Sequence, residues 1–183
     1  SRKVGRTGDT RYPDKKIKCY NPCAEQGLED RETCCLATIF LPNIESEQEL
    51  FEVASVLYKV NKGALALACH QPTTEAVVHK NYRMGISVTG TMEATEEQLS
   101  WLAPTSDRIR ILDEEYSREH GLPISIKLFT VQPSGTLSLL PGVTPGCHPA
   151  YSKYMIRRIR IASNHPLVKV CREHGYPVEY QRL

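Results

Sequence analysis

Residues 38–57 read Thr-Ile-Phe-Leu-Pro-Asn-Ile-Glu-Ser-Glu-Gln-Glu-Leu-Phe-Glu-Val-Ala-Ser-Val-Leu, and this stretch decides the fold class. Its first four residues predict a short buried strand, which Pro42 and Asn43 close. Ser46 and Glu49 then have the spacing of a capping box, which predicts the start of a helix. Apolar residues recur at helical spacing after this cap, at Leu50, Val53, Ala54 and Leu57.

Strands and helices continue to alternate along the chain, which predicts an α/β protein with parallel strand pairing. The pattern alone leaves a barrel, a half-barrel and an open sheet as alternatives. The segment 1–18 is basic and is expected to be irregular. Gly63 could interrupt the first helix, and a second helix is expected from Thr73 or Thr74. A strand over 84–90, a helix from about Ser106 to His120 that stops at Gly121, and a strand over 124–131 should follow. The remaining expected features are a Pro/Gly-rich loop over 133–149 and a short helix near 167–174.

The composition of the 183 residues, with 40% hydrophobic and 24% charged residues, is that of a globular protein and fits one domain or part of a larger one. A net charge of +2 is too small to indicate a nucleic-acid partner. No apolar run approaches the roughly 20 residues that span a bilayer, so no membrane partner is expected. The chain opens at Ser1, which indicates a cut or spliced piece or, equally, a trimmed tag.

The 7 cysteines are an odd number, which argues against a secreted disulfide framework. We therefore expect a reducing compartment, the cytoplasm. Basic residues gather in 1–18 and in 148–172. These segments suit a phosphate-bearing ligand or an acidic partner, although solvated surface is the commoner meaning of a lone basic run.

The densest group of reactive residues is Asn21-Pro22-Cys23-Ala24-Glu25, followed by Cys34-Cys35-Leu36. In an extended segment Cys23 and Glu25 point to the same side, so a thiol and a carboxylate could address one small substrate. A buried cysteine beside an exposed glutamate is the simpler alternative. A zinc site is another alternative, but adjacent Cys34 and Cys35 are awkward as two ligands of one tetrahedral ion, so no metal site is expected.

A second candidate site follows the strand expected over 124–131. The run Pro133, Ser134, Gly135, Thr136, Leu137 and Ser138 offers backbone N–H groups and hydroxyls that could cradle phosphate oxygens, particularly if a helix begins there. An ordinary turn has the same composition. A third feature, Asn-Tyr-Arg-Met-Gly-Ile over 81–86, is compatible with a core strand that has a polar start.

These motifs, with Pro-Ser-Gly-Thr at 133–136, occur in an order that resembles the adenosylcobalamin-dependent, class II ribonucleotide reductases, especially the monomeric ribonucleoside-triphosphate reductases. The resemblance covers the chain from about residue 10 onward. It implies part of a ten-stranded α/β barrel of two half-barrels, in which a finger loop carries a radical cysteine to the centre. Residues 1–183 would be a single portion of this catalytic barrel: 1–18 an irregular basic lead-in, 19–42 the finger loop and flanking strand, and 43–183 the second half-barrel.

The resemblance also implies a role for each matching residue. Cys23 would carry the thiyl radical that takes the 3′ hydrogen of the ribose, and Glu25 would take the 3′-hydroxyl proton. Asn21 would help to hold the substrate. Cys34 would be one half of the redox dithiol, chosen over Cys35 because the family pattern is Cys-x-Leu. The loop from Pro133 to Ser138 would hold the substrate phosphates.

The implied cofactor is adenosylcobalamin, and the implied activity is the reduction of ribonucleotides, with triphosphates favoured, for DNA precursor synthesis. A mate for Cys34 and a C-terminal reducing cysteine pair are not matched in this sequence. We therefore expect a second polypeptide or a missing segment to supply the first half-barrel, and an external dithiol reductant of the thioredoxin kind. The alternatives are a glycyl radical enzyme of the same barrel, for which the C-terminal region offers only Gly175, and a zinc-stapled binding module.

Overall fold

The structure is a computed structural model that describes residue 14, residues 16–154, residue 156 and residues 158–180. Most of the basic segment expected over 1–18 therefore lies outside the described residues. The chain divides into two compact units, Ser1–Ala150 and Tyr151–Leu183, and each is described by itself.

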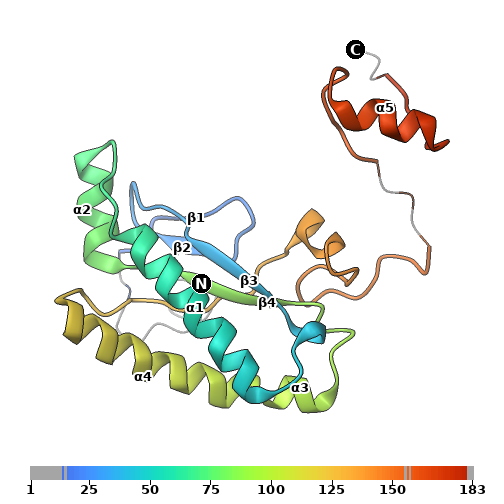
Figure 1. The fold of residues 1–183 in the computed structure, drawn as a ribbon. Coiled ribbons are helices and arrows are strands. Elements are labelled where there is room, and N and C mark those ends of the chain that lie inside the picture. The colour runs from blue at the N-terminus through green and yellow to red at the C-terminus, as the bar shows by residue number, and fades with distance from the viewer. Residues whose placement is uncertain (1–13, 15, 155, 157, 181–183) are drawn as a thin grey trace. The chain divides into compact units, whose positions relative to one another are not determined.

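The first unit is built on two parallel strands, β3 (Leu36–Phe40) and β4 (Gly85–Thr89). Their register places Leu36 opposite Gly85 and Phe40 opposite Thr89. A 3-10 turn, η1 (Leu41–Asn43), and two helices, α1 (Glu47–Leu65) and α2 (Pro72–Asn81), connect the strands. Figure 1 shows this strand–helix–strand arrangement at the centre of the unit. The parallel α/β pairing predicted from the sequence is confirmed.

Helix α1 begins where the sequence predicts. The Ser46 hydroxyl accepts the N–H of Glu49 at 3.2 Å, but the Glu49 carboxylate accepts the N–H of Glu45 at 2.6 Å, so one half of the predicted capping box is formed. The expected interruption at Gly63 is wrong, because α1 continues to Leu65. The helix tolerates this glycine because its flanking turns pack against the core, and propensity yields to tertiary packing.

Helix α4 (Leu102–His120) begins earlier than Ser106, the expected start. Pro104 lies in its first turn, where a proline removes no intrahelical hydrogen bond. The helix ends at Gly121, as predicted, because this residue adopts a left-handed conformation with φ of 63°.

A short helix, α3 (Glu96–Ser100), was not expected from the sequence. Its signal is the capping box that Thr95 and Gln98 form in full. The Gln98 side chain also donates to the carbonyl of Ile44 at 2.8 Å, which ties α3 to the turn after β3.

The regular strand predicted over 124–131 is wrong. This segment does lie beside β4, where Ile86 donates to the Leu128 carbonyl at 2.7 Å and accepts from the N–H of Thr130 at 3.1 Å. The regular ladder does not extend on either side of this bridge. The N–H of Gln132 donates to the Ser87 hydroxyl at 2.9 Å, and the N–H of Met84 donates to the Lys127 carbonyl at 3.0 Å. Further back, the N–H of Ser125 donates to a buried carboxylate of α4 at 3.0 Å.

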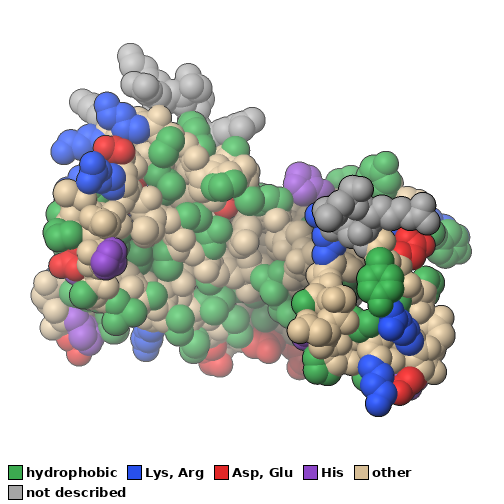
Figure 2. Space-filling model, turned by 90° about the horizontal axis from the view of Figure 1, so that it is seen from above, with side chains coloured by type: hydrophobic (Ala, Val, Ile, Leu, Met, Phe, Trp, Pro, Cys, Tyr) green, Lys and Arg blue, Asp and Glu red, His purple; other side chains and the backbone are tan. Residues whose placement is uncertain are grey.

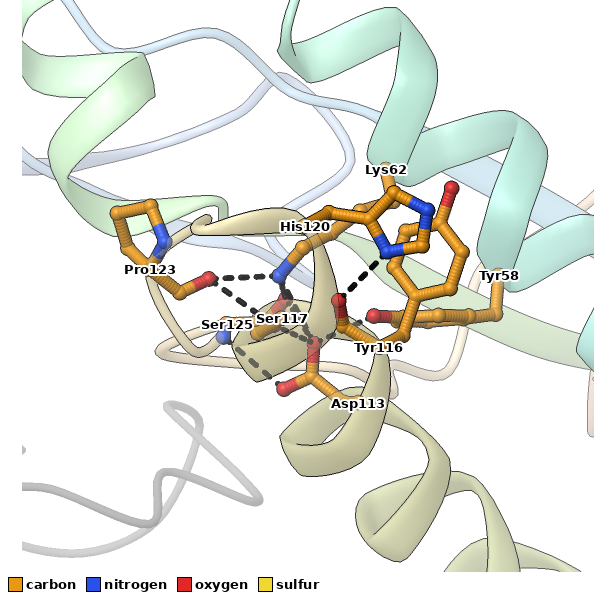
Figure 3. A network of polar contacts seen from close by, with 8 residues as sticks. All are labelled: Tyr58, Lys62, Asp113, Tyr116, Ser117, His120, Pro123 and Ser125. Carbon is orange, nitrogen blue, oxygen red and sulfur yellow. Dashed lines mark hydrogen bonds and ion pairs between the residues drawn. The ribbon is translucent and has the colours of Figure 1, made fainter.

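Helices α1 and α4 pack against each other, and α1 also contacts both strands (Figure 1). A buried polar network joins the two helices, as Figure 3 shows. Lys62 of α1 donates to Asp113 of α4 at 2.9 Å, and Tyr58 and Ser125 donate to the same carboxylate oxygen. The surrounding core consists of Ile39, Leu41, Ile44, Leu50, Ala54, Tyr58, Leu65, Val78, Tyr82, Met84, Ile86, Ile109 and Leu128.

In the described residues of the second unit there is one helix, α5 (Pro166–Glu173), close to the helix predicted near 167–174. Hydrophobic and basic side chains share the visible surface of this unit (Figure 2). Its exposed large hydrophobic residues include Tyr151, Tyr154, Ile156, Ile159 and Tyr180. Across the described part of the chain, no helix is both long and apolar enough to cross a membrane.

Candidate active site

The motif at residues 21–25 forms the turn of an antiparallel hairpin between β1 (Cys19–Tyr20) and β2 (Gly27–Leu28). Asn21 closes the turn, because its backbone N–H donates to the Gln26 carbonyl and its side-chain oxygen accepts the Gln26 N–H, both at 3.0 Å. Ala24 has a φ of 61°, a left-handed conformation that is uncommon for a residue other than glycine. The Cys23 thiol is exposed on this turn.

The Asn21 side-chain amide joins the other two reactive groups. Its Nδ2 donates to Oε1 of Glu25 at 2.5 Å and to Sγ of Cys34 at 3.2 Å. An amide nitrogen carries two hydrogens, so both are used within the protein. The resemblance implies that Asn21 helps to hold the substrate, and the structure places this buried side chain between a carboxylate and a thiol.

Glu25 has one free carboxylate oxygen. Its Oε1 accepts from Asn21, whereas Oε2 is buried and has no hydrogen-bond partner among the described residues. The lone pairs of this oxygen are open to a donor from a bound molecule, because no described residue uses them. This arrangement suits a general base.

The two adjacent cysteines have different surroundings. Partial burial is the main cause that raises the pKa of the Cys34 thiol, and the charges of Glu25 and Cys23 raise this pKa further. The hydrogen bond from Asn21 and the charge of Lys127 act to lower it. Burial, and then the neighbouring Cys34, raise the pKa of the Cys35 thiol, which packs against the hydrophobic core. Cys34 is therefore the cysteine of the pair that contacts Asn21 beside Glu25, and its raised pKa keeps it as a thiol at neutral pH.

Two residues of the segment beside β4 hold the backbone of the finger loop. The Lys127 ammonium and the Thr130 hydroxyl both donate to the Glu25 carbonyl, at 3.1 and 2.7 Å. Lys127 is buried, and its pKa is lowered first by that burial and then by the charge of Arg83. Neither residue belongs to a motif recognised in the sequence, although a lysine within the apolar run 124–131 is a usable signal.

The motif at 81–86 secures the chain after β2 through two carboxylates, Glu29 and Glu32. Asn81 donates to both of them, at 3.1 and 2.8 Å, and Lys80 donates to Glu29 at 2.8 Å. Burial alone would raise the pKa of Glu29, but the hydrogen bonds from Lys80 and Asn81 outweigh it, so the pKa is lowered.

Arg83 is the third member of this attachment. It is fully buried and pairs with Glu32 at 3.0 Å and with Asp14 at 2.7 Å. The guanidinium thus joins the segment before β1 to the loop that leads into β3. The polar start of the predicted core strand therefore holds the finger loop in place.

The candidate phosphate loop, residues 133–138, lies near the carboxyl end of β4, where Ser134 contacts Thr89, the last residue of the strand. A 3-10 helix, η2 (Gly135–Leu139), starts within it, as phosphate binding would favour. The Ser134 hydroxyl is buried and is bonded by Thr89 and by the N–H of Gly146. Gly135 and Thr136 are the first two residues of η2, so their N–H groups have no acceptor within the helix, and both residues are exposed. The backbone of the loop is therefore available to a ligand, whereas the Ser134 side chain is not.

The structure brings Asn21, Cys23, Glu25 and Cys34 together on the β1–β2 hairpin and next to it. Among the described residues no hydrogen bond joins them to the loop from Pro133 to Ser138, which continues directly from the segment that holds Glu25. Within the described ranges, no group of three or more His, Cys, Asp or Glu residues could hold a metal ion.

Comparison with known proteins gives a consistent result. No protein-family model matches the chain. A relative from Dictyostelium discoideum, described as a probable adenosylcobalamin-dependent ribonucleoside-triphosphate reductase, is 36% identical over 92% of this chain and 23% of its own length. The adenosylcobalamin-dependent ribonucleoside-triphosphate reductases of Euglena gracilis and Lactobacillus helveticus are 34% and 31% identical, over 94% and 98% of this chain and 24% and 28% of their own lengths.

A solved structure agrees with these relatives. The crystal structure of a B12-dependent, class II ribonucleotide reductase matches 92% of this chain and 28% of its own chain, with a TM-score of 0.76 and 26% sequence identity. The fold is therefore that of part of the α/β barrel of a class II ribonucleotide reductase, as expected. Within that class, the chain is homologous to one segment of the adenosylcobalamin-dependent ribonucleoside-triphosphate reductases. It spans about a quarter of the length of the curated relatives it matches.

Proposed function

We propose that this chain supplies the finger loop and most of the second half-barrel of an adenosylcobalamin-dependent ribonucleoside-triphosphate reductase. One observation carries the proposal: the Asn21 amide joins the Glu25 carboxylate to the Cys34 thiol, next to the exposed thiol of Cys23. A hydrogen-atom carrier, a proton acceptor and a reducing thiol are the groups that reduction of a ribose needs. The complete enzyme would form deoxyribonucleotides for DNA synthesis.

The proposed reaction uses these groups in order. The Cys23 thiyl radical takes the 3′ hydrogen of the ribose, and Glu25 takes the 3′-hydroxyl proton. The bond between C2′ and its oxygen breaks, and the 2′-hydroxyl leaves as water after it gains a proton. Cys34 and a second cysteine outside this chain give up two hydrogens: one forms the new C2′–H bond, the other balances the proton that left in the water, and the two sulfurs join as a disulfide. Cys23 finally returns its hydrogen to C3′ and Glu25 returns its proton to the 3′ oxygen, so the net change converts a ribonucleotide and a dithiol into a deoxyribonucleotide, a disulfide and water.

The position of Cys23 fits a radical generator that binds from outside this chain. Its thiol is exposed on the turn of the hairpin, where a bound group could reach it. Adenosylcobalamin would supply the radical that converts this thiol to a thiyl radical. The hydrogen bonds of Asn21 hold the turn, including Ala24 in its left-handed conformation, so the sulfur can keep one position during hydrogen transfer.

The substrate phosphates would bind at Pro133, Ser134, Gly135, Thr136, Leu137 and Ser138. The exposed N–H groups at the start of η2 support this assignment, because such groups favour anions. The resemblance favours a triphosphate. The Ser134 hydroxyl would act by holding the loop through Thr89 rather than by binding phosphate.

The rest of the barrel would come from a second polypeptide or a further segment. Within the described residues, β3 pairs with a strand on one side only, which leaves a strand edge for the first half-barrel. That half would also cover Cys23 and supply the mate of Cys34. In the proposed enzyme, residues 1–18 are a lead-in, 19–42 are the finger loop and its flanking strand, and 43–183 are the second half-barrel. The reductant would be an external, thioredoxin-like dithiol, and the enzyme would work in the cytoplasm.

Reconstitution tests the proposal. The chain is assayed alone and with the completing half, using adenosylcobalamin, a ribonucleoside triphosphate and dithiothreitol. We expect deoxynucleotide formation, at around 1 per second or more, only in the complete mixture. No product in the complete mixture would contradict the reductase function, whereas product from the chain alone would contradict the need for a second half. One bound zinc per chain in a metal analysis would instead favour the binding module.

A further inference from the structure

The Glu25 peptide is held by two donors that the proposed reaction does not use, one from the buried Lys127 and one from the half-buried Thr130. A carbonyl oxygen has two lone pairs, and here the Lys127 ammonium and the Thr130 hydroxyl supply one hydrogen bond each, at 3.1 and 2.7 Å. Both donors belong to the same segment beside β4, which is itself bonded to the strand. The carbonyl of Glu25 is therefore fixed to the sheet rather than to the hairpin.

This anchor lies next to the strained residue of the hairpin. Ala24 has a φ of 61°, and a residue other than glycine in this region costs about 1–3 kcal/mol unless its surroundings hold it there. The Lys127 and Thr130 hydrogen bonds act on the following residue, so they help to impose the turn. The same turn directs the Glu25 side chain to Asn21, which in turn reaches Cys34.

Burial of the Lys127 ammonium costs more free energy than one hydrogen bond to a carbonyl restores. Its side chain is 1% exposed, and among the described residues the Glu25 carbonyl is the one acceptor of its ammonium. Burial of an ammonium with unused donors is unfavourable, so packing alone does not account for it. The charged and titratable groups that act on it are Arg83, Glu25, Cys34 and Asp14.

We propose that Lys127 is a positioning residue of the reductase site, which with Thr130 anchors the finger loop through the Glu25 carbonyl and places a positive charge beside Cys34. The inference rests on the proposed function, because the groups it positions are those of the proposed reaction. Lys127 does not touch the reacting atoms; it acts through Glu25.

The first test is kinetic and uses the assembled enzyme. Thr130→Val and Lys127→Met each remove one anchor, and a displaced finger loop should lower kcat by about 10²-fold while KM for the nucleotide stays near that of wild type. Thr130→Ser, which keeps the hydroxyl, should restore turnover. Lys62→Met is the matched control, since it removes a buried lysine of the helix network and should lower stability without this loss of kcat. Wild-type kcat in both Thr130→Val and Lys127→Met would overturn the inference.

The second test needs no turnover, so it separates this inference from the proposed function. Alkylation of Cys34 is followed against pH in a Cys35→Ser background, which lets peptide mass spectrometry resolve the site. The Lys127 charge lowers the pKa of Cys34, so Lys127→Met should move the alkylation profile to higher pH, while Lys127→Arg and Lys62→Met should leave it in place. A profile that does not move in Lys127→Met would overturn the inference, even if the enzyme makes deoxynucleotides.

Discussion

Asn21 and Cys34 lie 13 positions apart in the sequence, yet the side-chain amide of one donates to the sulfur of the other at 3.2 Å. The contact joins the turn of the finger loop to the start of β3. It also places Cys34, rather than Cys35, in the reactive group. The two cysteines should therefore respond differently to substitution, and the carboxylate that shares the amide should be essential.

Glu25→Gln should slow the reaction far more than it weakens nucleotide binding. The amide keeps the shape of the carboxylate but cannot take the 3′-hydroxyl proton, and loss of a general base costs about 10²–10⁴-fold in rate. The measurement is kcat and nucleotide Kd in the assembled enzyme. Glu45→Gln, at an exposed position before α1, is the control and should behave as wild type. Equal turnover in Glu25→Gln would exclude the carboxylate as the base.

Cys34→Ser should block repeated turnover with a dithiol reductant, whereas Cys35→Ser should have a mild effect. The reason is that Cys34 contacts Asn21, while Cys35 packs against the core. The measurement is the number of deoxynucleotides formed per enzyme with excess dithiothreitol. The opposite pattern would show that Cys35 is the redox residue.

Asp113→Asn should lower the free energy of unfolding by about 3–5 kcal/mol, because it removes the carboxylate charge that pairs with the buried Lys62 ammonium. Burial alone would raise the pKa of Asp113, but hydrogen bonds from Lys62, Tyr58 and Ser125 outweigh it and hold the pKa below its ordinary value of 3.8. This carboxylate therefore adds stability above pH 3.8, which is lost as the pH falls through the lowered pKa. Urea denaturation at several pH values measures both effects. A variant as stable as wild type at neutral pH would refute them.

Two glycines should respond in opposite ways to alanine. At Gly85 a Cβ would lie 2.6 Å from both Leu36 and Thr130, so Gly85→Ala should destabilise the chain by about 1–3 kcal/mol. At Gly63, inside α1, a Cβ would meet no atom within 4 Å, so Gly63→Ala should stabilise by about 0.5–1 kcal/mol. Thermal denaturation compares the pair, and a loss of stability in Gly63→Ala or none in Gly85→Ala would contradict the packing described.

The sequence was sufficient for the parts of the fold that depend on local signals. The strand and cap in 38–57 predicted β3 and α1, and Gly121 predicted the end of α4. The segment 124–131 was misjudged because its β-branched residues suggest a strand, whereas its backbone is partly bonded to side chains such as Asp113. Such competition depends on residues distant in the sequence.

The site was predictable where residues lie close together in the sequence. Asn21, Cys23 and Glu25 form one motif, and the ordered resemblance supplied Cys34. Lys127 was missed because its function depends on a contact 102 positions away, with the Glu25 carbonyl. A single sequence contains no signal for that pairing beyond a charge within an apolar run.

If Cys23 carries the radical, serine at this position must stop the reaction. Deoxynucleotide formation is compared in the assembled wild-type enzyme, in Cys23→Ser and in the control Cys19→Ser, an exposed cysteine on β1. Serine is close to cysteine in size but does not readily form the radical, so Cys23→Ser should bind nucleotide normally and form no product, while Cys19→Ser should match wild type. Substantial turnover in Cys23→Ser would show that Cys23 does not carry the radical.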